Sequence, residues 1–401
     1  MPGPIRDVAQ RLCDAGHGVW WIGEGLLALL RGEPPVAWVL ATNAAPDDVP
    51  RVLEHAIPSR RGGAAFVVPS AAGPVDVQPL RWGSQVEGDL AHAGFRLLAM
   101  AWSWPAAQLV DPYGGIEDFV ADRLAAVGDA AAALAERPLL ALVAARLIAE
   151  QPLSLDPALA IALREARTEP LARVPAAALR REISALLLAP GAGRGVALLR
   201  ESGTERALGL RSDAGTARLV DAMPCDLALR LLAWTAGHGG NRLLGRLRFA
   251  PECRQRVGQL LQYHPVEQRL SGARRPALRR ALRRLPDGAF AALAELRAAQ
   301  LANAGSEEYA EDARRALAAL HEAVRALELE ADRAAHEPVL VWRGRDVILA
   351  LGIDPGPQVG EALRYLREQV AKDDKLNTPE ALRGLLDTWR LSRASGADAS
   401  P

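Results

Sequence analysis

The carboxylates in the first part of the chain lack the paired spacing that catalytic metal ions need. Two-metal chemistry on phosphates needs two carboxylates spaced two apart on a strand, where both point to one face, and a third from a neighbouring strand. Asp76, in the strand-like segment VDVQPLR, is a single carboxylate of this kind. Asp47 and Asp48 are adjacent, so a strand would direct them to opposite faces, and at a helix start they would act as caps. One carboxylate cannot hold a two-metal site, and we expect Asp76 to be a solvated strand residue.

Cysteine and histidine also lack the spacing of a metal site. Cys13, Cys225 and Cys253 are scattered and odd in number, which favours a reduced protein without disulfides. His238 and His264 have no carboxylate partners, and two isolated histidines make a poor zinc site. We expect both to be structural or surface histidines, and we expect no metal.

Arginines are the strongest candidates for contact with nucleic acid. Arg275, Arg279 and Arg283, with Arg280 and Arg284, stand at four-residue spacing and would form a continuous positive ridge on a helix. Upstream basic residues extend this candidate surface: Arg242, Arg246, Arg248, Arg254, Arg256, Arg269 and Arg274. The alternative, equally weighted, is a solvated face paired with the acidic helix at 307–332, because 48 basic and 48 acidic residues balance to a net charge of zero.

Length and composition predict a soluble protein of two or three domains. Its 401 residues are half apolar, which is enough for more than one core. The N-terminal MPGPIRDVAQ has no apolar signal core, and Arg or Pro interrupts apolar runs before they reach membrane-spanning length. We therefore expect a cytoplasmic protein that has no membrane partner.

The texture of the sequence changes along the chain. Short β-branched segments separated by Gly and Pro occur up to about residue 125, and the strand candidates are Val19–Ile22, 36–40, 65–68 and 75–78. From Ala130 onward the chain is rich in Ala, Leu and Arg at helical spacing, including a long charged stretch from about 287 to 336. This pattern predicts an α+β protein, with a small N-terminal α/β head followed by an all-helical remainder.

The stretch from Trp20 reads WWIGEGLLALLRGEPPVAWVLATNAAPDDV and is followed by FVVPSAAGPVDVQPLR. It resembles the head of class II tRNA nucleotidyltransferases (CCA-adding enzymes) and bacterial poly(A) polymerases. In that family the corresponding segment contains Gly-Gly-x-Val-Arg-Asp, then a Leu-Leu-Gly turn, and then Asp-x-Asp in a strand that ends Ala-Thr-x-Ala-x-Pro. The residues in register are Leu29, Leu30, Gly32, Ala41, Thr42, Asn43, Ala44, Pro46 and Val49. Further motifs, such as DPYGGIEDF at 111–119, extend the resemblance from about residue 12 to 386.

The residues that hold metal and phosphate in the family are replaced. Ala37 and Val39 stand where the paired aspartates belong, so the resemblance identifies a degenerate member. Asp76 and Arg81 match the family's third carboxylate and the arginine that closes that strand, and we interpret both as vestigial. Glu24 interrupts the paired glycines of the phosphate-binding turn and would repel phosphate unless a metal bridged the two.

The nucleotide-reading residues are altered in the same direction. In the family, an Asp and an Arg of the neck hydrogen-bond the base, and here Arg137 and Leu140 occupy those positions. Arg146 is retained, as is Gly23 of the phosphate turn. Gly23, Arg137 and Arg146 are therefore expected to be vestigial nucleotide-binding residues.

The resemblance also predicts how the chain is divided. Residues 1–126 would form the nucleotidyltransferase-like head, 127–200 a helical neck, 201–290 a helical body, 291–390 a helical tail, and 391–401 a disordered C-terminus. The body resembles a degenerate metal-phosphohydrolase (HD-type) module, with Ala236 and Gly237 in place of its His-Asp pair. Tryptophans gather in the head, where we expect the cluster to fill the vacated nucleotide cleft: Trp20, Trp21, Trp38, Trp82, Trp102 and Trp104. Trp38, between the two replaced aspartates, would point to the opposite, core side of its strand.

Polar groups for metal, phosphate and base are lost, whereas glycines, prolines and packing positions are kept. We therefore expect a catalytically inactive paralogue, without cofactor, that binds structured RNA such as tRNA or serves as a regulatory or partner subunit of another protein. The residues expected to bind RNA are Arg242, Arg246, Arg275, Arg279, Arg280, Arg283 and Arg284. The alternative is an active nucleotidyltransferase that extends RNA 3′ ends with Mg²⁺ and ATP or CTP, using a rearranged site built from Asp47, Asp48 and Asp76.

Overall fold

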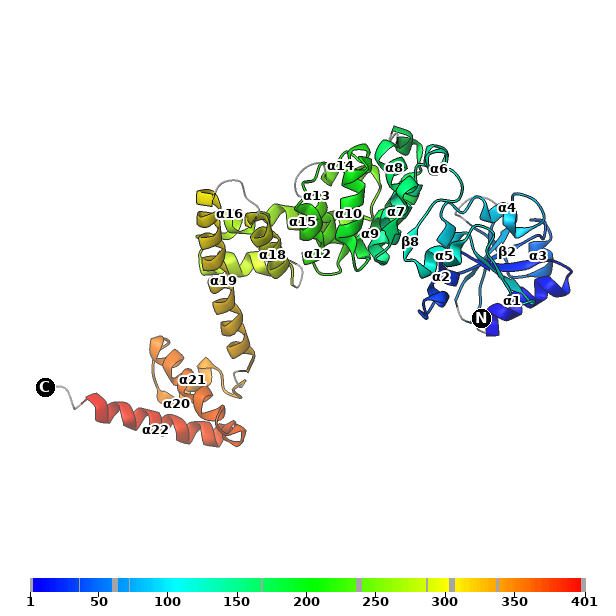
Figure 1. The fold of residues 1–401 in the computed structure, drawn as a ribbon. Helices are drawn as coiled ribbons and strands as arrows, with labels where there is room; N and C mark the ends of the chain where they lie inside the picture. Colours follow the sequence, from blue (N-terminus) through cyan, green and yellow to red (C-terminus); the bar gives the residue numbers. More distant parts are fainter. Residues whose placement is uncertain are drawn as a thin grey trace. The chain divides into compact units, whose positions relative to one another are not determined.

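The structure is a computed structural model of the chain (Figure 1). It describes residues 3–35, 37–59, 64–71, 73–166, 169–235, 240–285, 288–302, 307–336 and 339–397. Within these residues, no helix is both long enough and apolar enough to cross a membrane.

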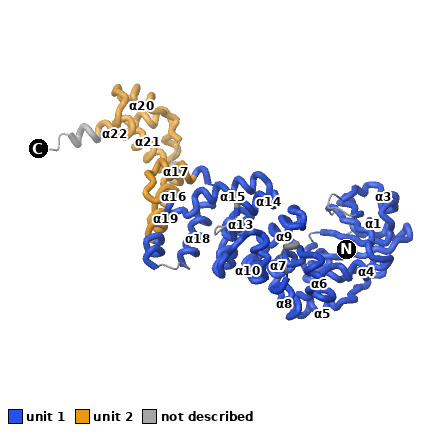
Figure 2. Tube along the Cα trace, turned by 90° about the horizontal axis from the view of Figure 1, so that it is seen from above, with its two compact units in different colours: residues 1–270, 283–314 blue, residues 271–282, 315–401 orange. Residues whose placement is uncertain are grey.

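The chain forms two compact units (Figure 2). The first contains Met1–Leu270 and Arg283–Arg314, and the second contains Ser271–Leu282 and Arg315–Pro401. The finer division into head, neck, body and tail stays a prediction.

The first unit begins with a seven-stranded mixed sheet whose strand order is β3-β4-β5-β2-β1-β6-β7. Its strands are β1 Val19–Ile22, β2 Trp38–Thr42, β3 Ile57–Pro58, β4 Phe66–Val68, β5 Val75–Pro79, β6 Ala101–Trp104 and β7 Leu109–Val110. β2 and β5 run parallel, and the other neighbouring strands run antiparallel. The α+β fold predicted from the sequence is confirmed.

The strand predictions differ from the structure mainly at the sheet edges. β1 has its predicted bounds, and β4 and β5 differ by one residue. β2 begins at Trp38 and continues to Thr42, and Val36 lies outside the described residues. The short strands β3, β6 and β7 were not predicted, because brief segments such as AWSW become strands only by pairing with a neighbour.

Side chains alternate along the strands, so that one face of the sheet packs against the core and the other face lines a cleft. Trp21 of β1 and Trp38 of β2 are buried and stacked, with ring centroids 4.6 Å apart. Val75 and Val77 of β5 join the same core, and Asp76 between them points to the other face. The helices of the head are α1 Gly3–Asp14, α2 Glu24–Leu30, α3 Val49–Val52, α4 Val86–Leu90 and α5 Gly115–Val120.

Helices make up most of the rest of the first unit, as predicted. They are α6 Ala130–Glu136, α7 Leu140–Glu150, α8 Pro157–Glu165, α9 Ala176–Leu188, α10 Ala192–Glu201, α11 Thr204–Ala207, α12 Thr216–Ala222, α13 Leu227–Thr235, α14 Gly240–Arg246, α15 Pro251–Tyr263, α16 Val266–Leu270 and α18 Ala289–Leu301. One short parallel pair, β8 Arg123–Leu124 with β9 Ser154–Leu155, departs from the all-helical expectation. α7 is almost wholly apolar and is buried along most of its length.

The second unit is helical and has its own core. Its helices are α17 Arg275–Leu282, most of α19 Glu307–His336, α20 Gly344–Leu351, α21 Pro357–Val370 and α22 Pro379–Ala397. Val347, Leu366 and Leu382 are fully buried in that core.

Two helix predictions need correction. The charged stretch from 287 to 336 consists of two helices, α18 and α19, and residues 303–306 between them lie outside the described residues. α22 continues to Ala397, so residues 392–397 are helical where disorder was expected, since the helical spacing of the preceding turns carries on into this segment. Residues 398–401 lie outside the described residues.

Candidate functional site

A cleft of about 820 Å³ is lined by the strands of the head and by helices α7 and α9. From the sheet come Ile22 at the end of β1, Val39 of β2 and Asp76 of β5. Helix α7 contributes Arg146 and Glu150, and α9 contributes Glu182. All of these residues lie in the first unit.

The positions of the missing carboxylates lie in this cleft. Ala37 and Val39 both line it, and the parallel register of β2 and β5 places Val39 beside Asp76. Asp47 and Asp48 are not among the lining residues, and Asp48 instead holds Arg51 at 2.8 Å. In the part of the chain that the structure describes, no group of three or more His, Cys, Asp and Glu side chains is arranged to hold a metal ion. The residues present therefore do not fit the metal pair that the family fold implies.

The turn between β1 and α2 carries Glu24 into the cleft. Gly23 has a φ of 82°, a backbone conformation that residues with a Cβ rarely adopt. A Cβ on Gly25 would lie 2.1 Å from the carbonyl oxygen of Ala37, so glycine lets α2 approach the start of β2 this closely. Both glycines of the turn thus have a structural use.

Arg146 is surrounded by carboxylates. Its Nε donates to Glu182 at 2.7 Å and its Nη1 to Glu150 at 2.8 Å, while Nη2 donates to Glu24. Glu24 was expected to repel phosphate unless a metal bridged the two, and in the structure its carboxylate accepts a hydrogen bond from Arg146. The sequence analysis identified Arg146 but missed this cluster, for which only the four-residue spacing of Arg146 and Glu150 is a sequence signal.

Burial and charge act against each other in this cluster. Burial lowers the pKa of Arg146, but the carboxylates of Glu24, Glu150 and Glu182 outweigh it and hold that pKa above its usual value. Burial raises the pKa of the Glu150 carboxyl, and Arg146 opposes that rise. Arg146 stays charged, so the cluster is an ion-pair network.

Arg81 and Arg137 lie at the rim of the cleft. Asp89 accepts hydrogen bonds from the backbone N–H groups of Arg81 at 2.9 Å and of Trp82 at 3.1 Å. Arg137 donates through Nη1 to the carbonyl oxygen of His92, and its buried Nε has no hydrogen-bond partner. Of the vestigial residues predicted from the sequence, the cleft brings together Gly23, Asp76, Arg81, Arg137 and Arg146.

The expectation that tryptophans fill the cleft is wrong. Among the described lining residues Trp82 is the one tryptophan, and it stacks on His92 with centroids 3.8 Å apart and planes at 6°. Trp21 and Trp38 are buried in the core on the opposite face of their strands, as strand alternation requires. The cleft is therefore open.

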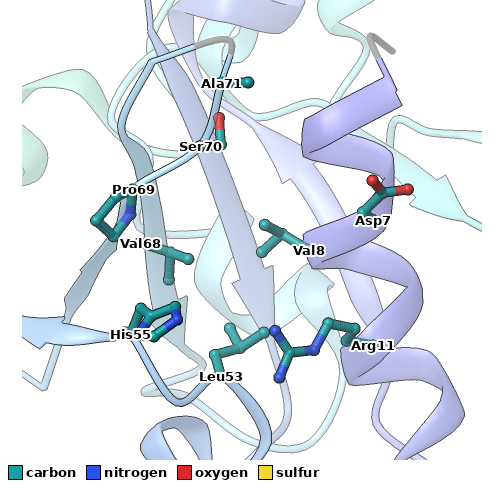
Figure 3. Close-up of a pocket in the computed structure, with 9 residues that line it drawn as sticks. All are labelled: Asp7, Val8, Arg11, Leu53, His55, Val68, Pro69, Ser70 and Ala71. Carbon is teal, nitrogen blue, oxygen red and sulfur yellow. The ribbon is translucent and has the colours of Figure 1, made fainter.

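A second, smaller cavity of about 170 Å³ lies in the head between α1 and the segments around residues 55 and 70 (Figure 3). Asp7 and Arg11 of α1 face His55 and Ser70 across it. Arg11 donates to the carbonyl oxygen of Val52 at 2.7 Å, so that arginine ties α1 to the last residue of α3.

The basic residues do not form one continuous helical ridge. α17 ends at Leu282, so Arg283 and Arg284 lie in the turn beyond it and cannot stack on Arg279 and Arg280 as helix neighbours. Pro286 explains this end, because a proline disfavours helix at the residues before it. In the second unit, Arg275 and Arg279 both pair with Glu330 of α19, at 2.8 and 3.0 Å.

The remaining predicted site residues lie in the helical part of the first unit. Arg242 and Arg246 are exposed on α14, and Arg246 reaches the carbonyl oxygen of Ala207 at 3.3 Å. His264 is half-buried at the end of α15, where burial and then the charge of Arg297 lower its pKa. His238, Ala236 and Gly237 lie outside the described residues.

Comparison with known proteins gives consistent relatives. No family model matches the chain. An A-adding tRNA nucleotidyltransferase of Deinococcus radiodurans is 28% identical over 403 aligned residues, covering 85% of this chain and 89% of the relative. A CCA-adding enzyme of Geobacillus stearothermophilus is 27% identical over 221 residues, covering 51% of this chain and 54% of the relative.

Solved structures share the fold along nearly the whole chain. The CCA-adding enzyme of Bacillus stearothermophilus in complex with CTP has a TM-score of 0.63 at 24% identity, covering 98% of this chain and 100% of that one. The Thermotoga maritima CCA-adding enzyme complexed with tRNA has a TM-score of 0.60 at 12% identity, covering 96% of this chain and 94% of that one. With the motif order and the sheet topology, these relatives agree: the chain is similar in sequence and in fold to CCA-adding enzymes and related tRNA nucleotidyltransferases.

Proposed function

We propose that this chain is a catalytically inactive member of its family that binds structured RNA, such as tRNA, or acts as a regulatory or partner subunit. The observation that carries the proposal is the pair Ala37 and Val39 in the cleft beside Asp76. A methyl and an isopropyl group cannot ligate a cation. A single carboxylate cannot gather the metals that activate a 3′-hydroxyl and neutralise a triphosphate.

The RNA-binding part of the proposal is supported by the relatives and by exposed arginines. A relative of the same fold is known in complex with tRNA, and the fold is retained from head to tail. Arg242, Arg246 and Arg280 are exposed, and none has an ion-pair partner among the described contacts that the structure records. Such arginines suit backbone phosphates of a folded RNA.

Transfer activity remains the second candidate, because the two curated relatives are nucleotide-adding enzymes and the cleft is open. Under that alternative, Mg²⁺ and ATP or CTP would be required. Asp76 would have to act with Asp47 and Asp48, which lie outside the lining of the cleft.

Incorporation of radiolabelled ATP or CTP into tRNA that lacks its 3′ terminus tests the proposal. With Mg²⁺ or Mn²⁺, we expect the wild-type chain and Asp76→Ala to give the same background signal. The double variant Ala37→Asp, Val39→Asp restores the family spacing of carboxylates and serves as a check on whether the cleft can regain metal. Incorporation by wild type above the Asp76→Ala level would refute the proposed inactivity.

A further inference from the structure

Arg146 is the buried cation of the head cleft, and all of its donor nitrogens are already in use. Its side chain is 6% exposed, and each of its Nε, Nη1 and Nη2 atoms donates to a different glutamate. An anion that entered the cleft would therefore compete with these carboxylates for the guanidinium.

The three glutamates differ in how readily they could be displaced. The side chain of Glu24 is 47% exposed, compared with 33% for Glu150 and 6% for Glu182. Glu150 lies one turn along α7 from Arg146, and Glu182 is buried on α9. Glu24 instead starts α2 in the head, 122 residues away in the sequence. It is the exposed ligand of Arg146 and the one that joins the head to the neck.

We propose that Glu24 is a built-in anion that competes with phosphate-bearing ligands for Arg146 and, while bound there, fastens α2 to α7. A carboxylate and a phosphate oxygen are both good partners for a guanidinium. A tethered carboxylate competes at high effective concentration, because its binding is intramolecular. This goes beyond catalytic inactivity, since it makes the cleft reject polyanions even where no metal chemistry is asked of it.

The surrounding charges strengthen this exclusion. With Glu24 in place, three carboxylates surround one guanidinium, and Asp76 lies on the facing strand. Two further cations lie close to the cluster: Arg181 pairs with Glu182 at 3.0 Å, and the charge of Arg31 acts on Glu150. A polyanion would therefore meet a surplus of like charge at this end of the cleft.

Binding of metal-free pyrophosphate to the full chain tests the proposal. Isothermal titration in EDTA would compare wild type, Glu24→Gln, and Glu54→Gln, an exposed head residue outside the cleft that gives the same change in charge. Glu24→Gln should bind pyrophosphate about tenfold more tightly than the other two. In phosphate-free buffer its melting temperature should fall by about 2 °C relative to Glu54→Gln.

A third variant locates the effect. Adding Arg146→Lys to Glu24→Gln should remove most of the gain, because lysine cannot reproduce the fork of donors. Equal pyrophosphate affinity in Glu24→Gln and Glu54→Gln would overturn the competition, and equal melting temperatures would overturn the fastening of α2 to α7. Neither result bears on inactivity, which nucleotide incorporation measures separately.

Discussion

Single side chains decide what the head cleft can hold. β2 and β5 keep the parallel register that would bring carboxylates together, yet Val39 faces Asp76 where a second acid would be needed. Arg146 survives from the family pattern but is held by Glu24, Glu150 and Glu182. The same scaffold thus positions an internal ion-pair network at the end of the cleft that would otherwise receive an anion.

Gly25 gives a test at this scale. Gly25→Ala would place a methyl group 2.1 Å from the carbonyl oxygen of Ala37, so the backbone must shift. We expect the free energy of unfolding to fall by about 1–3 kcal/mol, measured by urea denaturation with tryptophan fluorescence.

Gly258→Ala is the matched control, because no atom lies within 4 Å of the added Cβ on α15. This variant should be more stable than wild type by about 0.5–1 kcal/mol, since alanine favours helix over glycine. If Gly25→Ala were as stable as wild type, the Cβ at residue 25 could not lie 2.1 Å from the carbonyl oxygen of Ala37.

At the scale of elements, two features of α17 determine which of its arginines are exposed without an ion pair: the helix ends at Leu282, and ion pairs join it to α19. Both Arg275 and Arg279 are held by Glu330, which agrees with the alternative of a paired, solvated face for these two residues. Arg280 is exposed on the same helix and is left for other partners. The paired, solvated face therefore describes Arg275 and Arg279, whereas the RNA-binding interpretation applies to Arg280.

The variant Glu330→Gln tests whether Arg275 and Arg279 can also bind RNA once their ion-pair partner is removed. If this face contacts RNA, releasing Arg275 and Arg279 should raise affinity for tRNA by roughly two- to fivefold, with a steeper dependence on salt concentration. Filter binding across a salt series would measure both. Glu328→Gln, an exposed change of equal charge on α19, should have a smaller effect, and equal effects would indicate a general change in charge rather than the release of a ridge.

At the scale of the whole molecule, separate cores imply that the units can lose structure separately (Figure 2). The second core is built from α20, α21 and α22, with Leu366 fully buried. The fold similarity to the CCA-adding enzyme of Bacillus stearothermophilus nevertheless covers 98% of this chain and so includes both units.

Leu366→Ala should lower the stability of the second unit by about 2–5 kcal/mol, because it leaves a cavity in a small core. Hydrogen exchange should quicken in α20 to α22 and stay unchanged in α7. Leu349→Ala, at a site that is 81% exposed, should change exchange in neither unit. Faster exchange in α7 of Leu366→Ala would show that the units unfold together.

The sequence by itself determined the order of the α+β fold, the central strands and the apolar side chains of Ala37 and Val39. These features are local, because strand and helix periods, turn residues and side-chain chemistry are written in neighbouring positions. The short strands β6 and β7 and the end of α17 depended on pairing partners and on a helix stop, and were missed or misplaced.

Only the tertiary structure decided that the cleft stays open and that Glu24 meets Arg146. The tryptophans of the head were expected to fill the cleft, with Trp38 directed to the core side, whereas packing sends Trp21 into the core as well. Glu24 and Arg146 are 122 residues apart. Their contact depends on how two separately formed elements pack, and no local pattern specifies it.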